Sequence, residues 1–128
     1  MITNMKLNAV EAKRLKEGEI RGLGINIALD EVKVEGGEVA IKFTYTADYQ
    51  EGVGTLIMKG ELEAKEESKL AKEIEEKWKK EKKLPDGFAE LVLNNVNYAC
   101  GANGTLVVRA VNLSPPMIPP RIEVAKKQ

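Results

Sequence analysis

Residues 38–49 read Glu-Val-Ala-Ile-Lys-Phe-Thr-Tyr-Thr-Ala-Asp-Tyr, and this stretch decides the fold of the chain. Every second residue in it is apolar, and the members of that set are Val39, Ile41, Phe43, Tyr45, Ala47 and Tyr49. Successive side chains of a strand point to opposite faces of a sheet, so the pattern predicts an amphipathic strand with one buried face. Its aromatic residues make this face the best candidate surface for binding another molecule. A core face covered by the protein's own helix has the same pattern.

The segment before this strand predicts a second strand that contains a β-bulge. Apolar residues alternate through 25–29 and then continue through 32–34 one residue out of phase. One extra residue in a strand shifts the side chains in this way, so we expect a bulge at residues 30–31. The Gly-Gly pair at 36–37 suits a two-residue hairpin connection to the strand at 38–49.

Two further strands complete a sheet over residues 1–64. Residues 53–64 alternate in the same manner after a turn at 50–52, and residues 6–17 fit a strand better than a short helix. Connections this short join antiparallel neighbours, because parallel neighbours need a long crossover. We therefore expect a four-stranded antiparallel sheet.

The chain changes character at residue 65. Residues 65–83 are rich in Glu and Lys, and Leu70, Ile74 and Trp78 follow one another at intervals of four. This spacing predicts a helix with a narrow apolar stripe and a broad solvated face. The lysines are interleaved with glutamates, which indicates a solvated surface rather than a phosphate-binding one.

Residues 88–113 fit two structures about equally well. Their apolar residues match a helical period, whereas Asn103-Gly104 followed by a β-branched run at 105–108 is typical of a hairpin. The two alternatives differ in what alanine would do at position 104. In a helix interior alanine is the better helix former and should be tolerated or mildly stabilising. In a hairpin turn that needs positive φ it should cost stability.

The C-terminal segment, residues 114–128, is expected to be extended. It begins Ser-Pro-Pro-Met-Ile-Pro-Pro, and prolines remove backbone donors and fix φ. The segment is therefore predicted to lie near the polyproline II conformation. Met117 and Ile118, between the two proline pairs, are its apolar anchors and candidate contacts for a bound peptide.

Length and charge bound the class of protein. The chain has 128 residues, which suits one domain spanning 1–128, and its 20 basic residues balance its 20 acidic ones. This balance favours neither nucleic acid nor an anionic membrane as partner. No apolar run approaches the ~20 residues that cross a bilayer, and the first residues lack the order of a signal peptide. We expect a cytoplasmic protein.

Composition also limits the chemistry. Histidine is absent, which excludes histidine-based nucleophilic pairs and histidine metal sites. The single cysteine, Cys100, permits no disulfide within one chain and fits a small buried hydrophobe better than a reactive thiol. We expect no enzyme activity, metal or cofactor. The enrichment in Glu and Lys is compatible with a thermophilic source.

The order of these segments resembles that of the SecB export chaperone family and its shorter archaeal relatives. One part of the resemblance is residues 39–62, where an alternating strand runs through a short turn into Thr-Leu-Ile-Met-Lys-Gly-Glu-Leu. The other is residues 96–120, where Val-Asn-Tyr-Ala-Cys and Leu-Val-Val-Arg-Ala precede Leu-Ser-Pro-Pro-Met-Ile-Pro-Pro. The resemblance implies an α+β fold, in which the four-stranded antiparallel sheet packs against C-terminal helices over 65–113. It therefore favours helix for residues 88–113.

The resemblance also implies a function. We expect an ATP-independent chaperone-like protein that binds non-native polypeptides through apolar surfaces, with Phe43, Tyr45, Tyr49, Met117 and Ile118 as the peptide-binding residues. A homo-oligomer, dimer or tetramer, would cover the outer strands and multiply weak contacts. The alternative is a non-catalytic structural or adaptor subunit whose apolar surfaces serve only its own oligomer. Because this neutral chain lacks the acidity of the bacterial export chaperone, the resemblance implies polypeptide binding more strongly than protein transport. Export, toxin control and general holding all stay open.

Overall fold

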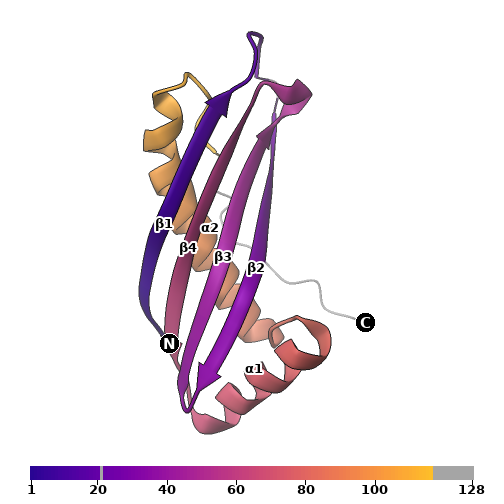
Figure 1. The fold of residues 1–128 in the computed structure, drawn as a ribbon, viewed down its shortest axis with the longest axis vertical. Coiled ribbons are helices and arrows are strands. Elements are labelled where there is room, and N and C mark those ends of the chain that lie inside the picture. The colour runs from indigo at the N-terminus through magenta and orange to yellow at the C-terminus, as the bar shows by residue number, and fades with distance from the viewer. Residues whose placement is uncertain (21, 117–128) are drawn as a thin grey trace.

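The structure, a computed structural model, describes residues 1–20 and 22–116. Four strands precede two α-helices in chain order (Figure 1). Their bounds are β1 Ile2–Arg14, β2 Leu23–Glu35, β3 Glu38–Tyr49, β4 Gly54–Lys65, α1 Ser68–Glu81 and α2 Asp86–Arg109, with a short 3₁₀ turn at Gln50–Gly52. The predicted sheet and the predicted helix at 65–83 are confirmed, and the first strand begins four residues earlier than expected.

The sheet is antiparallel throughout, in the order β1-β4-β3-β2. The predicted bulge is confirmed, since the register of β2 against β3 shifts between Leu29 and Glu31. The hairpin at 36–37 is confirmed as well, and Gly36 there has φ of 61°, a conformation that glycine adopts without strain. β1 and β2 are the two edges of the sheet.

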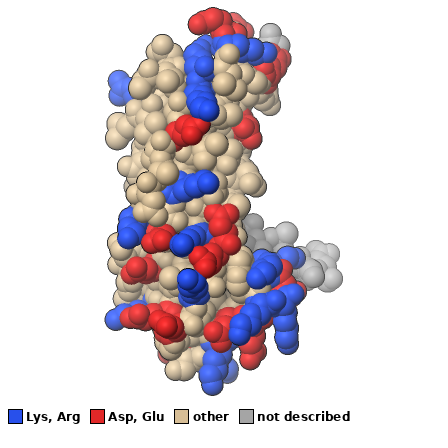
Figure 2. Space-filling view, in the orientation of Figure 1, with Lys and Arg blue, Asp and Glu red and all other residues tan. Residues whose placement is uncertain are grey.

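The helices do not cover the sheet evenly. In Figure 1, α2 crosses behind the sheet on a diagonal, from β2 and β3 at the hairpin end to β1 at the opposite end, and α1 lies across the hairpin end. The face toward α2 is called the inner face below. The alternating apolar residues of β3 lie there, and those of β4 join them in one core with residues of both helices. Figure 2 shows the opposite face, where charged side chains gather toward the hairpin end.

Residues 86–109 are helical, so the hairpin alternative for 88–113 is wrong. The structure adds a contact that bears on the expected tolerance of alanine at position 104. A methyl group on Gly104 would lie 2.8 Å from Leu56 Cδ2 of β4 and 3.3 Å from Pro116 Cγ. Gly104 is thus a point of close approach between helix and sheet, where helix propensity does not decide the outcome.

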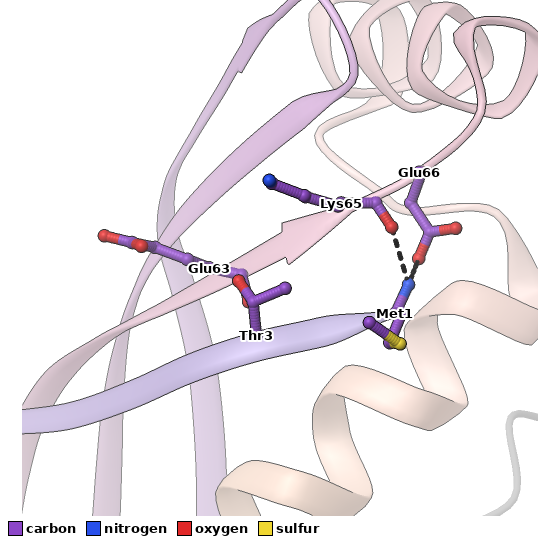
Figure 3. Close-up of polar contacts among 5 residues, drawn as sticks. All are labelled: Met1, Thr3, Glu63, Lys65 and Glu66. Carbon is purple, nitrogen blue, oxygen red and sulfur yellow. Dashed lines mark hydrogen bonds and ion pairs between the residues drawn. The ribbon is translucent and has the colours of Figure 1, made fainter.

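The N-terminal residue contacts the end of β4. Its ammonium group forms an ion pair with Glu66 and donates to the Lys65 carbonyl oxygen at 2.8 Å (Figure 3). Next along the strand, the Thr3 hydroxyl donates to the Glu63 carbonyl oxygen at 3.3 Å. These contacts join β1 to the end of β4, just before α1 begins.

Candidate functional site

The three aromatic residues predicted to bind peptide lie on the inner face in the middle and far part of β3. Phe43, Tyr45 and Tyr49 are 1%, 0% and 2% exposed, so the rest of the chain covers them in this conformation. All three are at odd-numbered positions of β3 and therefore share its buried face, as the sequence indicated. A bound segment would reach them only if part of their cover moved aside.

Tyr45 has a feature that its burial does not explain. Its hydroxyl is buried and has no hydrogen-bond partner among residues 1–20 and 22–116. Burial, together with the nearby Cys100 and Tyr49, raises the pKa of Tyr45 to about 12. An unpaired buried hydroxyl costs about 1–3 kcal/mol, and phenylalanine would avoid that cost. Within the described part of the chain, the hydroxyl is therefore a donor without a partner in the middle of an apolar face.

Tyr49 is paired. Its hydroxyl donates to the Ser114 carbonyl oxygen, which ties the chain after α2 to the inner face. Leu113 packs against Gly54 of β4, and Pro116 is buried near Gly104. The chain therefore turns back after α2 and enters the space between helix and sheet. Met117 and Ile118, the other two predicted peptide-binding residues, lie outside the described residues.

β2 carries a row of apolar side chains beside these aromatics. The row consists of Leu23, Ile25, Ile27 and Leu29, and we call it the inner row. Its members pair across the sheet with alternate residues of β3, from Tyr49 to Phe43, and each is only partly buried. Sequence reasoning used this row only to find the strand. The missed signal was that residues 23–29 contain no charge in a chain with 31% charged residues.

The outer edge of β2 presents unpaired backbone groups at regular intervals. The Gln50 amide donates to the Gly22 carbonyl oxygen at 2.9 Å, so these two residues form a hydrogen-bonded pair. Such pairs recur at every second position of an antiparallel ladder. The even-numbered residues from 24 to 28 therefore direct their amides toward β3, and the inner row directs its amides away from the sheet. Within residues 1–20 and 22–116, no backbone hydrogen bond reaches β2 from that outer side.

An open pocket of about 740 Å³ lies between α1 and the hairpin end of the sheet. β2 lines it with residues 32–35, next to the inner row but beyond the bulge, and α1 contributes Trp78. Positively charged lysines and negatively charged glutamates complete the lining, together with parts of β3 and β4. The pocket offers apolar surface to one large side chain beside β2.

The solvent side of α2 has an apolar stripe of its own. Leu91, Tyr98 and Leu106 are 41%, 69% and 68% exposed. Steps of seven and eight residues keep them on one side of a helix. We call them the outer stripe, and they form a second apolar surface separated from the inner row by the helix itself.

The described residues offer little for chemistry. Cys100 is a buried free thiol, and burial raises its pKa to about 12, which disfavours the reactive thiolate. Over the described part of the chain, no three His, Cys, Asp or Glu residues are grouped so that they could hold a metal ion. Neither of the described α-helices is long and apolar enough to cross a membrane.

Comparison with known proteins identifies the fold. No protein-family model and no curated protein sequence matches the chain. The fold matches a solved structure, the Mycobacterium tuberculosis Rv1957 SecB-like chaperone in complex with a ChAD peptide from the Rv1956 HigA1 antitoxin. The TM-score is 0.61 at 11% sequence identity, and the match covers 100% of this chain and 91% of that chain. At this identity the likeness establishes the fold alone. The sheet and helices have the SecB-like fold.

Proposed function

We propose that this protein is an ATP-independent chaperone-like protein that holds non-native polypeptides in the cytoplasm. The observation that carries the proposal is the partly exposed inner row, which lies beside the buried aromatic face on the uncharged first half of β2. Apolar side chains of an unfolded segment gain about 25 cal/mol for each Å² that they bury on such a surface. Binding of this kind involves no covalent step and no nucleotide.

The predicted peptide-binding residues have distinct places in this proposal. The inner row is the accessible wall of the site, and Phe43, Tyr45 and Tyr49 are its floor. Residues 114–116 lie against this inner face, and Met117 and Ile118, outside the described residues, are proposed as further peptide-binding residues. A bound segment would displace part of the cover over these aromatics, and the Tyr45 hydroxyl would then donate to a backbone carbonyl of the segment.

The SecB-like fold supports the proposal from a second direction. The similar solved structure is called a SecB-like chaperone and contains a bound peptide. The inference carried over to this chain is the class of partner, an extended polypeptide, and not the particular peptide.

The test is whether the protein suppresses aggregation of a chemically denatured client, measured by light scattering without ATP. We expect suppression that saturates near a fixed molar ratio of the two proteins. Replacing Met117 and Ile118 by serine should weaken suppression while circular dichroism keeps most of the helix and strand signal. A wild-type protein that holds no unfolded client at any ratio would exclude the proposed function.

The second candidate is a structural or adaptor subunit, and the outer stripe favours it. Three large apolar side chains on the solvent side of one helix suit an interface between copies of the chain, which would form a dimer or tetramer. Light scattering after gel filtration should then give a mass that is a multiple of 14.1 kDa. Replacing Tyr98 and Leu106 by lysine should return it to the monomer mass. If the assembly dissociates and client holding is unaffected, the outer stripe serves only assembly.

A further inference from the structure

The charges of α1 and its flanking residues are separated along the chain. Residues 66–76 contain five glutamates and two lysines, whereas residues 77–83 contain five lysines and one glutamate. The second stretch, which we call the basic end, therefore has four more positive than negative charges in a chain whose net charge is zero. Figure 2 shows Lys and Arg side chains gathered at the lower right, where Figure 1 places α1.

The structure does not neutralise the basic end. Four of its lysines are exposed and Lys77 is partly buried. Glutamates stand four residues before Lys77, Lys79 and Lys80, a spacing that permits ion pairs along a helix. Within residues 1–20 and 22–116, however, none of the five lysines forms an ion pair. Lys82 alone has a contact, because its Nζ lies 5.4 Å from the centre of the Trp78 ring.

The helix dipole explains only part of this arrangement. Cations are favoured in the last turn of a helix, because the free carbonyl groups there carry partial negative charge. Lys79 and Lys80 lie in that turn, but Lys82 and Lys83 follow the last residue of α1. Lys82 also has φ of 55°, a conformation that glycine adopts with less strain. The chain thus carries positive charge at this point beyond what the dipole requires.

We propose that the basic end binds a short acidic segment of a partner protein. This partner is distinct from the client of the proposed function, because residues 23–29 of β2 carry no charge and lie at the end of the strand away from the hairpin and α1. The basic end extends over about 10 Å at 1.5 Å per residue. Three or four extended residues cover about that length, and lysine side chains reach further. A run of about four to six Asp or Glu residues therefore matches it.

A nucleic acid is a poorer match for the same charge. Proteins that bind nucleic acid neutralise phosphates along an extended surface, and the glutamates of residues 66–76 border the basic end and would repel a long polyanion. Arginine binds phosphate through a planar fork of donors, and α1 contains no arginine. Lysines with a glutamate-rich border suit a short acidic run better.

A second copy of the chain offers the other negative surface, its own residues 66–76. Lys69 and Lys72 interrupt that stretch, so it complements the basic end less well than an uninterrupted acidic run does. Exposed ion pairs alone also hold two rigid helices together only weakly. An extended segment adapts its carboxylates to the lysines. Binding of nucleic acid and pairing between copies are both outcomes of the test.

The first experiment measures binding of two peptides to the intact protein by fluorescence anisotropy. One capped, labelled peptide has six consecutive glutamates between Gly-Ser spacers, and its control has six glutamines. At about 0.05 M salt we expect the glutamate peptide to bind at least about tenfold more tightly, because each exposed charge pair contributes up to about fivefold in affinity. At about 0.3 M salt its affinity should fall by at least about fivefold through screening.

The second experiment compares two triple variants with the same change in net charge. One replaces Lys79, Lys80 and Lys83 of the basic end by glutamine, and the other replaces Lys13, Lys16 and Lys59, which are also exposed and lie outside α1. We expect the first to weaken binding of the glutamate peptide by at least about tenfold and the second by less than about twofold. Circular dichroism checks that both variants fold. Suppression of client aggregation should be the same for both variants and the wild type.

The outcomes separate this proposal from the alternatives and from the proposed function. Equal affinities of the two peptides, or equal effects of the two triple variants, would overturn it. An oligouridine of twelve nucleotides that binds at least about tenfold more tightly than the glutamate peptide, and is released by the basic-end variant, would make the site one for nucleic acid. A basic-end variant with half the assembly mass, and no peptide binding by the wild type, would assign the surface to a second copy.

Client holding gives an independent result. If the basic-end variant loses suppression of aggregation together with peptide binding, the basic end belongs to the client site and the proposal of a separate partner is wrong. If the wild type holds no client but binds the glutamate peptide as expected, the proposed function fails and the acidic partner stands. Should the basic-end variant fail to fold, the two peptides and the salt dependence on the wild type still decide.

Discussion

β1 and β2 occupy equivalent places in the sheet, and yet their surroundings differ. The residue before β1, Met1, forms an ion pair with Glu66, and β1 carries charges along its length. β1 borders β4, where Gly54 and Gly60 lie close to the backbone of β1. β2 has an uncharged first half and an inner row that stays partly exposed because α2 crosses away from it (Figure 1). Neither edge strand has a fully buried residue, so the two edges differ in charge and in regularity of register rather than in how deeply they are packed.

The largest difference in the free energy of unfolding is expected between alanine substitutions at two strand glycines, Gly60 and Gly24. A methyl group on Gly60 of β4 would lie 2.3 Å from the Lys6 carbonyl oxygen and 2.8 Å from Phe43 Cζ. On Gly24 of β2 it would meet nothing within 4 Å. We expect Gly60→Ala to lower the free energy of unfolding by about 2–4 kcal/mol because backbone must move, and Gly24→Ala to change it by less than about 0.5 kcal/mol. Urea unfolding measures both, and similar losses would mean that the two sides are packed alike.

The helix offers a similar pair. A methyl group on Gly104 would lie against Leu56 of β4. A methyl group on Gly87, in the first turn of α2, would meet nothing within 4 Å. Gly104→Ala should cost about 1–3 kcal/mol through overpacking, whereas Gly87→Ala should be neutral or gain up to about 1 kcal/mol from helix propensity. Thermal unfolding of the two variants tests this. A stable Gly104→Ala protein would show that α2 can withdraw from the sheet at little cost.

Alkaline pH should destabilise the packing of α2 on the sheet. Burial raises the pKa of Cys100 from 9.0 to about 12, so the folded state keeps the neutral thiol that the unfolded state loses. This stabilisation is complete below pH 9 and is lost as pH rises to 12, at about 1.4 kcal/mol per pH unit. Cys100→Ala should reduce the slope of unfolding free energy against pH over that interval, whatever its baseline stability. Residues 23–29 of β2 include no titratable side chain and should contribute nothing to the slope.

The smallest effect separates two tyrosines on the same strand. Tyr45→Phe removes a buried hydroxyl that has no partner among the described residues and should raise the free energy of unfolding by about 1 kcal/mol, the lower end of the cost of such a group. Tyr49→Phe removes the bond to the Ser114 carbonyl and should lower it by about 1 kcal/mol. Denaturant unfolding gives the stabilities, and client aggregation gives the activity. A Tyr45→Phe protein that is more stable and also holds clients as well as wild type would remove the proposed role of that hydroxyl.

Strand and turn chemistry could be predicted from the sequence because these signals are local. The alternation at 38–49, the phase slip at residues 30–31 and the Gly-Gly hairpin each depend on neighbours within a few residues, and each was confirmed. The choice between helix and hairpin at 88–113 was not local. Asn-Gly and the β-branched run favour a turn by intrinsic preference, and burial of one helix face against the sheet overrides that preference.

The sequence by itself determined the antiparallel sheet and the apolar face that carries the aromatic residues, because side-chain alternation follows directly from strand geometry. Only the tertiary structure decided which part of that face α2 covers, that Gly104 is a contact point, and that the first half of β2 stays open. Those facts depend on the angle at which α2 crosses the sheet and on strand order. Both arise from packing between residues far apart in the chain, and no pattern within a single segment contains them.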